Sequence, residues 1–140
     1  TSAEPDDPLD VDAAAARLLA DWYALGAQAL SRLARDLADD APTAPQLWPE
    51  HFDLAVEAGG ITYGFSPGDD VVPVPYAYVG PHGGPPTRDA FWNAPFGAYR
   101  THEEIGTPQG AVAFFLAARQ RLRRAQPDTP VQPDTTVRST

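Results

Sequence analysis

The sequence predicts an α+β fold, in which an antiparallel meander of three or four strands is covered on one face by a long N-terminal helix and a C-terminal helix. Helical periodicity over residues 11–39 and 108–125 predicts the two helices. Alternating apolar and polar residues on both sides of Gly59-Gly60 predict the sheet. A chain of 140 residues with 43% hydrophobic content can bury one modest core, so we expect a single domain over residues 10–125.

The two ends of the chain are predicted to be disordered arms. Residues 1–9 and 126–140 are rich in Pro, Thr, Asp and Gln and contain almost nothing apolar. The first helix is expected to begin after Asp10, which is a suitable N-cap. Trp22 lies within a stripe of leucines at three- and four-residue steps, which is typical of a core residue.

The hairpin around Gly59-Gly60 has a register that the sequence fixes, if these two residues form the loop. One face is then apolar and packs on the core, through the pairs Ala58/Ile61, Val56/Tyr63 and Leu54/Phe65. The other face is polar and small, through the pairs Glu57/Thr62, Ala55/Gly64, Asp53/Ser66 and His51/Gly68. Ala55 and Gly64 leave room on this polar face for water, a ligand or a closely packed backbone.

The third extended segment follows a turn at residues 66–70 and covers residues 71–79. Pro73 and Pro75 lack backbone donors, so we expect an edge strand or an extended strip over the sheet. Alternation separates two tyrosines from two small apolar residues, with Tyr76 and Tyr78 on one face and Ala77 and Val79 on the other.

Residues 80–96 are predicted to be an irregular loop whose aromatic residues either fold over the core or wall a pocket. Residues 97–105 supply a fourth short strand, and Thr107-Pro108 starts the last helix. The four arginines near the end of that helix are attributed to the helix dipole and to solubility, and they are Arg119, Arg121, Arg123 and Arg124.

Composition excludes several classes of function. The chain has no cysteine and all ten basic residues are arginine, so thiolate zinc sites, cysteine nucleophiles and lysine-based chemistry are excluded. A net charge of −9 disfavours nucleic acid and anionic membranes as partners. No segment resembles a signal peptide or a membrane span, so we expect a cytoplasmic protein, and we predict no cofactor.

Five runs carry a resemblance to a known family, namely QLWPEHFDLAVEAGG, GFSPGDD, PYAYVGP, FWN and GAVAFFLAARQ. Over roughly residues 10–124 the chain resembles an uncharacterised bacterial family, a domain of unknown function common in actinobacteria. The resemblance implies that the chain corresponds to the C-terminal part of such proteins, and that a strand-rich region precedes the long helix in them. It implies no activity, cofactor or catalytic residue. Where similar proteins have a further aromatic residue, this chain has Gly80-Pro81-His82.

His51 and Asp53 are the candidates for chemistry, because two residues apart on a strand they point the same way. A divalent metal is one hypothesis, with the set completed from Asp69, Asp70, His82 or His102. A second is hydrolase-like catalysis, in which Asp53 or Glu57 orients His51 as a base and Ser66 acts as nucleophile. The structural alternative is that His51 and Asp53 bind the backbone of the 66–70 turn.

We expect a binding or interaction module rather than an enzyme, with a pocket for a small molecule or short segment on the polar hairpin face. The expected binding residues are Trp48, His51, Asp53, Ser66, Tyr76, Tyr78, Trp92 and Asn93. A third reading is a structural domain that completes a larger sheet. An open edge at the 47–57 strand or the 97–103 strand would recruit the protein's own upstream region, another chain, or a second copy to form a homodimer.

Overall fold

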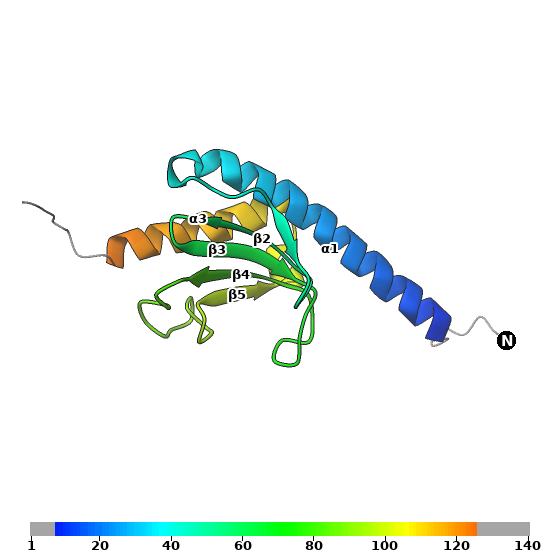
Figure 1. The fold of residues 1–140 in the computed structure, drawn as a ribbon. Coiled ribbons are helices and arrows are strands. Elements are labelled where there is room, and N and C mark those ends of the chain that lie inside the picture. The colour runs from blue at the N-terminus through cyan, green and yellow to red at the C-terminus, as the bar shows by residue number, and fades with distance from the viewer. Residues whose placement is uncertain (1–7, 126–140) are drawn as a thin grey trace, which may run out of the picture.

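Five antiparallel strands form a meander in the order β1-β2-β3-β4-β5, with the helices before and after it (Figure 1). The structure is a computed structural model that describes residues 8–125, so residues 1–7 and 126–140 of the predicted arms lie outside the described residues. The elements are α1 (Pro8–Asp36), a 3-10 turn (Ala38–Asp40), β1 (Gln46–Trp48), β2 (Asp53–Ala58), β3 (Ile61–Ser66), β4 (Tyr76–Pro81), β5 (Ala98–Thr101), α2 (His102–Ile105) and α3 (Pro108–Ala125). The predicted α+β class is confirmed, with five strands instead of three or four.

Both long helices pack on the same face of the sheet, as predicted. Helix α1 contacts β2 and β3, α3 contacts β4, and the two helices contact each other (Figure 1). The core lies between them and the sheet. The buried residues of α1, and Leu37 just after it, follow the predicted stripe: Trp22, Gly26, Ala29, Leu30, Leu33 and Leu37. Among the described residues, no helix combines the length and apolar content that crossing a membrane requires.

Helix α1 begins at Pro8, two residues before the predicted cap at Asp10, and ends at Asp36. Proline suits a first helical position because its missing N–H would have no partner there. The N-terminal end of α1 projects past the sheet (Figure 1), and from residue 12 to residue 21 only Leu19 is even half-buried. Apart from Leu19, the side chains of residues 12–21 therefore do not pack against the rest of the described chain.

The hairpin register is the predicted one. Strands β2 and β3 pair Leu54 with Phe65, Val56 with Tyr63, and Ala58 with Ile61. Gly59 and Gly60 have φ values of 59° and 79°, which other residues rarely adopt. The apolar face packs on the helices, although Leu54, at the open end of the hairpin, is only half-buried.

Phe65 is the centre of the core. Its ring meets the rings of Trp22 and Phe115 edge-on, at centroid distances of 5.1 Å and 5.5 Å. A Cβ at Gly26 would lie 2.9 Å from Phe65 Cγ, so the glycine lets α1 approach the ring. Trp22 also donates a 2.9 Å hydrogen bond from Nε1 to the Ser66 carbonyl, which ties α1 to the end of β3.

The prediction that the proline-containing segment forms a sheet edge is wrong. Strand β4 starts at Tyr76, after Pro73 and Pro75, and pairs with β3 on one side and β5 on the other. The prolines therefore lie in the preceding loop, where no ladder donor is needed. The alternation within the segment is confirmed, because Ala77 and Val79 are fully buried in the core.

The loop between β4 and β5 divides its aromatic residues between the two faces of the sheet. Trp92 joins the core, and Phe91 packs near Phe114.

Two arginines lie over the Phe91 ring, Arg100 at 4.8 Å and Arg121 at 4.1 Å from its centroid. Arg119 pairs with Asp40 through an Nε–Oδ2 contact of 2.8 Å. Two of the four clustered arginines thus have packing roles beyond the helix dipole.

The two edges of the sheet differ. The amide of Asn93 accepts from Tyr99 N–H at 3.0 Å and donates to Tyr99 C=O at 3.3 Å, which closes the outer edge of β5. Glu104 accepts from Thr101 N–H at 2.8 Å and completes this cover. Strand β1 is the other edge, and all three of its residues are exposed. Of the two edges that the sequence suggested, the 97–103 strand is covered by its own side chains.

Truncation of the core ring should be costly. We expect Phe65→Ala to lower the free energy of unfolding by about 3–5 kcal/mol, because a fully buried ring between Trp22 and Phe115 leaves a cavity that the sheet cannot close. Equilibrium unfolding in urea measures the loss. The matched control is Phe52→Ala, where the ring is 60% exposed and the change should stay within about 0.5 kcal/mol. Equal losses for both variants would contradict this account of the core.

Candidate functional site

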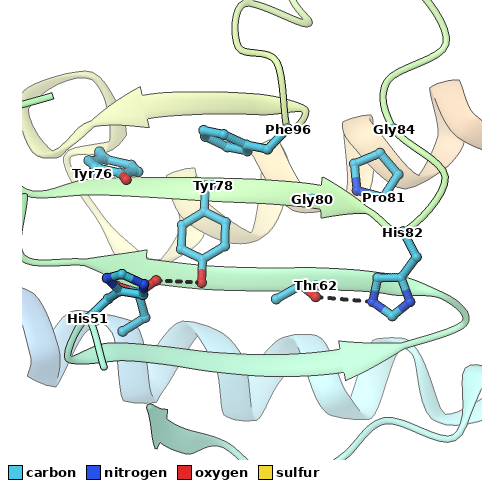
Figure 2. Close-up of a pocket in the computed structure, with 10 residues that line it drawn as sticks. His51, Thr62, Tyr76, Tyr78, Gly80, Pro81, His82, Gly84 and Phe96 are labelled. Carbon is cyan, nitrogen blue, oxygen red and sulfur yellow. Dashed lines mark hydrogen bonds between the residues drawn. The ribbon is translucent and has the colours of Figure 1, made fainter. Parts of the chain in front are cut away.

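A cavity of about 630 Å³ lies on the face of the sheet opposite the helices. Figure 2 shows its side chains in front of the strands, with the helices behind. The residues that line it come from the β1–β2 turn, strands β2, β3 and β4, and the following loop: His51, Asp53, Thr62, Tyr76, Tyr78, Gly80, Pro81, His82, Gly84 and Phe96. The volume is within the range of small-molecule sites. We call this cavity the sheet pocket.

A second cavity, of about 460 Å³, adjoins the sheet pocket on the side of the β3–β4 loop. Four residues line both cavities, and they are His51, Asp53, Tyr76 and Phe96. The two spaces therefore meet around Asp53. The loop side adds Ser66 and Asp69 to the lining.

Gly64 admits the ring of Tyr78 onto the sheet. Ala55, Gly64 and Tyr78 are paired neighbours across β2, β3 and β4. A Cβ at Gly64 would lie 2.5 Å from Tyr78 Cζ and 2.6 Å from its hydroxyl oxygen, which is too close for any other residue without displacement of the ring. The room that the small residues leave on the polar face is thus filled by this phenol, whose hydroxyl reaches Asp53.

Asp53 has one oxygen fixed and the other unused. Tyr78 donates a hydrogen bond of 2.9 Å to Asp53 Oδ2 (Figure 2), while the buried Oδ1 makes no hydrogen bond to any residue from 8 to 125. Burial raises the pKa of this carboxyl above its ordinary value, and the hydrogen bond from Tyr78, the charge of His51 and, least, the neighbouring Ser66 hydroxyl offset the rise in part. Burial, together with the charge of Asp53, also raises the pKa of Tyr78, so its phenol stays protonated and remains a donor.

A strained turn sets the position of Asp53. Phe52 has a φ of 58°, an unfavourable conformation for a bulky residue, and its side chain is exposed. Tyr23 of α1 holds this turn by donating a 2.6 Å hydrogen bond to the Phe52 carbonyl. His51 lies in the same turn and outside β2, so the expected placement of His51 and Asp53 together on a strand is wrong. Both residues nevertheless line the cavities. Strain of this kind is concentrated at functional sites.

Asp69 and Ser66 serve the β3–β4 loop. Asp69 Oδ1 accepts from the N–H groups of Val71 and Val72, and Oδ2 accepts from the Tyr76 hydroxyl at 2.6 Å. The bonds from Tyr76 and Val72 hold the pKa of Asp69 below its ordinary value. Ser66 is buried, and its Oγ accepts from Gly68 N–H at 3.0 Å. These two side chains bind the turn backbone, a role that the sequence had offered for His51 and Asp53.

Three aromatic rings wall the sheet pocket. Tyr76 and Tyr78 lie 6.1 Å apart between centroids, and Tyr78 and Phe96 lie 6.0 Å apart with their planes at 84°. Phe96 comes from the β4–β5 loop and is 42% exposed. The sequence predicts that the aromatic residues of the 80–96 loop either fold over the core or wall a pocket, and Phe96 does the second. It precedes Gly97, which has a φ of 156° and forms a bridge with Ala94 where the loop turns back.

Three of the expected binding residues lie outside both cavities. Trp92 is 2% exposed and belongs to the core, Trp48 lies on the edge strand β1, and Asn93 caps β5. None of these three therefore contributes to the wall of either cavity. The other five line one cavity or both, and they are His51, Asp53, Ser66, Tyr76 and Tyr78.

The geometry of the described residues gives little support to the catalytic and metal hypotheses. Within residues 8–125, no hydrogen bond joins His51 to Asp53 or Ser66, and no three His, Asp or Glu side chains are grouped to hold a metal ion. Asp70 is exposed and lines neither cavity, and the ring of His102 lies beside Trp22 at 6.3 Å. At the far end of the sheet pocket, His82 Nε2 and Thr62 Oγ1 form a 3.2 Å hydrogen bond (Figure 2).

Comparisons of the chain with protein-family models, with curated proteins and with solved structures gave no match. The resemblance to the actinobacterial family therefore stays a prediction. What the protein does has to be inferred from the residues at the sheet pocket.

Removal of the charge at Asp53 should stabilise the protein. Because burial raises the pKa of Asp53, ionisation at neutral pH lowers the stability of the folded state, and this loss disappears as pH falls through the folded pKa. Asn keeps an acceptor for Tyr78, so we expect Asp53→Asn to melt a few degrees above the wild type at pH 7. The difference should begin to shrink at a pH above the ordinary carboxyl pKa of 3.8, because the raised pKa makes the folded wild type take up its proton first, and it should vanish below that value. Thermal melts followed by circular dichroism measure both.

The control for this experiment is Asp70→Asn, which removes the same charge from an exposed position nearby. It corrects for the general gain from reducing the net charge of −9. A melting temperature for Asp53→Asn at or below that of Asp70→Asn would contradict the account of Asp53 as a costly buried charge.

Proposed function

We propose that this domain is a binding module that holds a small molecule, or one side chain of a short segment, in the sheet pocket. The observation that carries the proposal is that only one of the two carboxylate oxygens of Asp53 accepts a hydrogen bond. Its Oδ2 is fixed by Tyr78, while its buried Oδ1 has no partner among the described residues. A polar atom that the fold buries and leaves unpaired is an acceptor for a donor supplied from outside.

Stability does not explain Asp53. Asp53 is half-buried and its carboxylate accepts one hydrogen bond, so its charge costs folding free energy that Asn at this position would not cost. The fold nevertheless holds this group with a strained residue at Phe52 and an anchoring bond from Tyr23. Perturbed carboxyl groups in cavities are concentrated at functional sites, which supports a binding role.

Three of the five runs that carry the family resemblance converge on the two cavities. LWPEHFD supplies His51 and Asp53, GFSPGDD supplies Ser66 and Asp69, and PYAYVGP supplies Tyr76, Tyr78, Gly80 and Pro81. The three runs lie on different strands and turns and are separated in the sequence, so the fold alone brings their side chains together.

The hydrolase alternative has weaker support. A nucleophile needs a base within hydrogen-bond reach, whereas Ser66 Oγ is 3.0 Å from Gly68 N and its side chain is buried. His51 is exposed in the turn. Its place on the lining of both cavities suits ligand contact better than activation of Ser66.

A fragment screen by ¹H–¹⁵N NMR tests the binding function. We expect shifts at the amides of residues 51–53, 62, 78–80, 82 and 96 for the fragments that bind. Phe96→Ala removes one wall and should weaken their binding about tenfold, since an aromatic contact contributes about 1 kcal/mol or more. Leu18→Ala, at a 39% exposed residue of α1 outside both cavities, is the control. Shifts elsewhere, or equal effects of the two variants, would refute the assignment of the pocket.

A second candidate function is assembly through β1, and one observation favours it. The outer edge of β5 is closed by Asn93 and Glu104, while β1 presents an unpaired edge with Leu47 56% exposed and Trp48 41% exposed. Two identical edge strands that pair antiparallel are related by a two-fold axis, so this one edge suffices for a closed homodimer. The projecting half of α1 also gains stability when a partner packs on it.

Sedimentation velocity tests the dimer. The wild-type chain should sediment as a dimer at high concentration, and Leu47→Glu should shift it to monomer because a buried charge at the pairing edge is unfavourable. Val71→Glu makes the same change at an 88% exposed residue away from β1 and should leave the dimer intact. A wild-type monomer throughout the concentration range would rule out this candidate.

A further inference from the structure

We infer that the ligand of the sheet pocket is an organic cation whose protonated amino group binds Asp53 Oδ1 between aromatic rings. This inference rests on the proposed binding function and names the chemical class that the site accepts. It follows from three properties of the cavity walls, namely their charge, their free acceptor and their aromatic faces.

The fixed charges around the cavities favour a cation. Asp53 and Asp69 line them, whereas none of the arginines described in the structure does, and the chain contains no lysine. The three arginines nearest the core are occupied elsewhere, with Arg119 on Asp40 and both Arg100 and Arg121 on Phe91. Apart from His51 and His82, a phosphate or carboxylate would meet no basic side chain here, and it would face two acids.

The free acceptor requires a ligand that donates. Tyr78 donates to Asp53 Oδ2 and so fixes the plane of the carboxylate. The remaining buried Oδ1 can only accept while Asp53 is ionised. An ammonium group provides a hydrogen bond and a full opposite charge to this oxygen, which makes a stronger partner than a hydroxyl or an amide.

The aromatic walls suit the same cation. Tyr76 and Phe96 stand with Tyr78 at steep angles of 57° and 84°, as separate walls rather than a stack. The faces of such rings attract ammonium and alkylammonium groups through their quadrupoles, and the attraction grows where water is excluded. Figure 2 shows Tyr76 and Tyr78 beside His51 at one end of the pocket, with Phe96 further along the wall.

The rest of the ligand would lie toward His82. That end of the pocket is lined by Gly80, Pro81 and Gly84, and the nearest atom to a Cβ at Gly80 would be 3.9 Å away. The lining at this end is largely apolar and leaves space above the strands. The hydrogen-bonded pair of Thr62 and His82 marks the far end of the pocket (Figure 2). A free amine with a short apolar body fits this shape. A lysine side chain carries the same ammonium group and is the other source to distinguish.

Matched probes of one shape test the inference. Benzylamine, benzyl alcohol and benzoate present a cation, a neutral donor and an anion on the same ring, and N-acetyl-lysine methylamide presents the lysine source. Their dissociation constants for the whole chain are measured by NMR titration at pH 7. We expect benzylamine to bind at the pocket about tenfold more tightly than benzyl alcohol, with benzoate weakest. Tighter binding of the lysine probe than of benzylamine would identify a peptide side chain as the occupant.

The affinities of two variants for these probes test the role of the Asp53 charge. Asp53→Asn keeps the shape and should weaken benzylamine about tenfold while leaving benzyl alcohol unchanged, and Asp70→Asn should leave both unchanged. Unchanged benzylamine affinity in Asp53→Asn, or binding of benzyl alcohol or benzoate at least as tight as that of benzylamine, overturns the cation and leaves the binding function standing. Failure of all four probes to bind also overturns it, and the wider fragment screen then decides the binding function separately.

Discussion

The register of the β2–β3 hairpin is the constraint on which both faces of the sheet depend. Gly59 and Gly60 take positive φ values that make a two-residue turn, and pairing then runs from Ala58 opposite Ile61 to Leu54 opposite Phe65. A slip of one residue would turn Phe65 to the solvent and Asp53 into the core. The free energy that buries Phe65 therefore also holds Asp53 on the opposite face, so core and pocket are specified together.

The two faces use the same device, a glycine that admits an aromatic ring. On the helix side Gly26 lets α1 approach Phe65, and on the pocket side Gly64 lets Tyr78 lie across β3. The first contact brings α1 against the sheet, and the second sets the hydrogen bond that orients Asp53. Because each ring is seated against a backbone, neither can relax without a shift of its strand, and the acceptor at Asp53 is held rigidly.

Helical periodicity was enough to predict both helices, and alternation was enough to predict the hairpin and the side of the sheet on which Asp53, Tyr76 and Tyr78 lie. It failed where long-range contacts decide. The prolines suggested an edge, but β4 begins after them, and β5 pairs along its free side. Trp92 and Phe96 are four residues apart in one loop yet lie on opposite faces, since only the path of that loop determines their places. Strand β1 is too short to show a period.

Charge is separated in the same way as polarity, and this separation gives the site its chemistry. The arginines that make defined contacts are on the helix side or beside it, where Asp40 and the Phe91 and Phe114 rings engage them. The carboxylates of Asp53 and Asp69 are on the pocket side, and Tyr76 and Tyr78 donate to them. Each tyrosine thus contributes its hydroxyl to an acid and its ring to the pocket wall. A negative acceptor framed by aromatic faces is the consequence, and its sign follows from where the fold places its few cations.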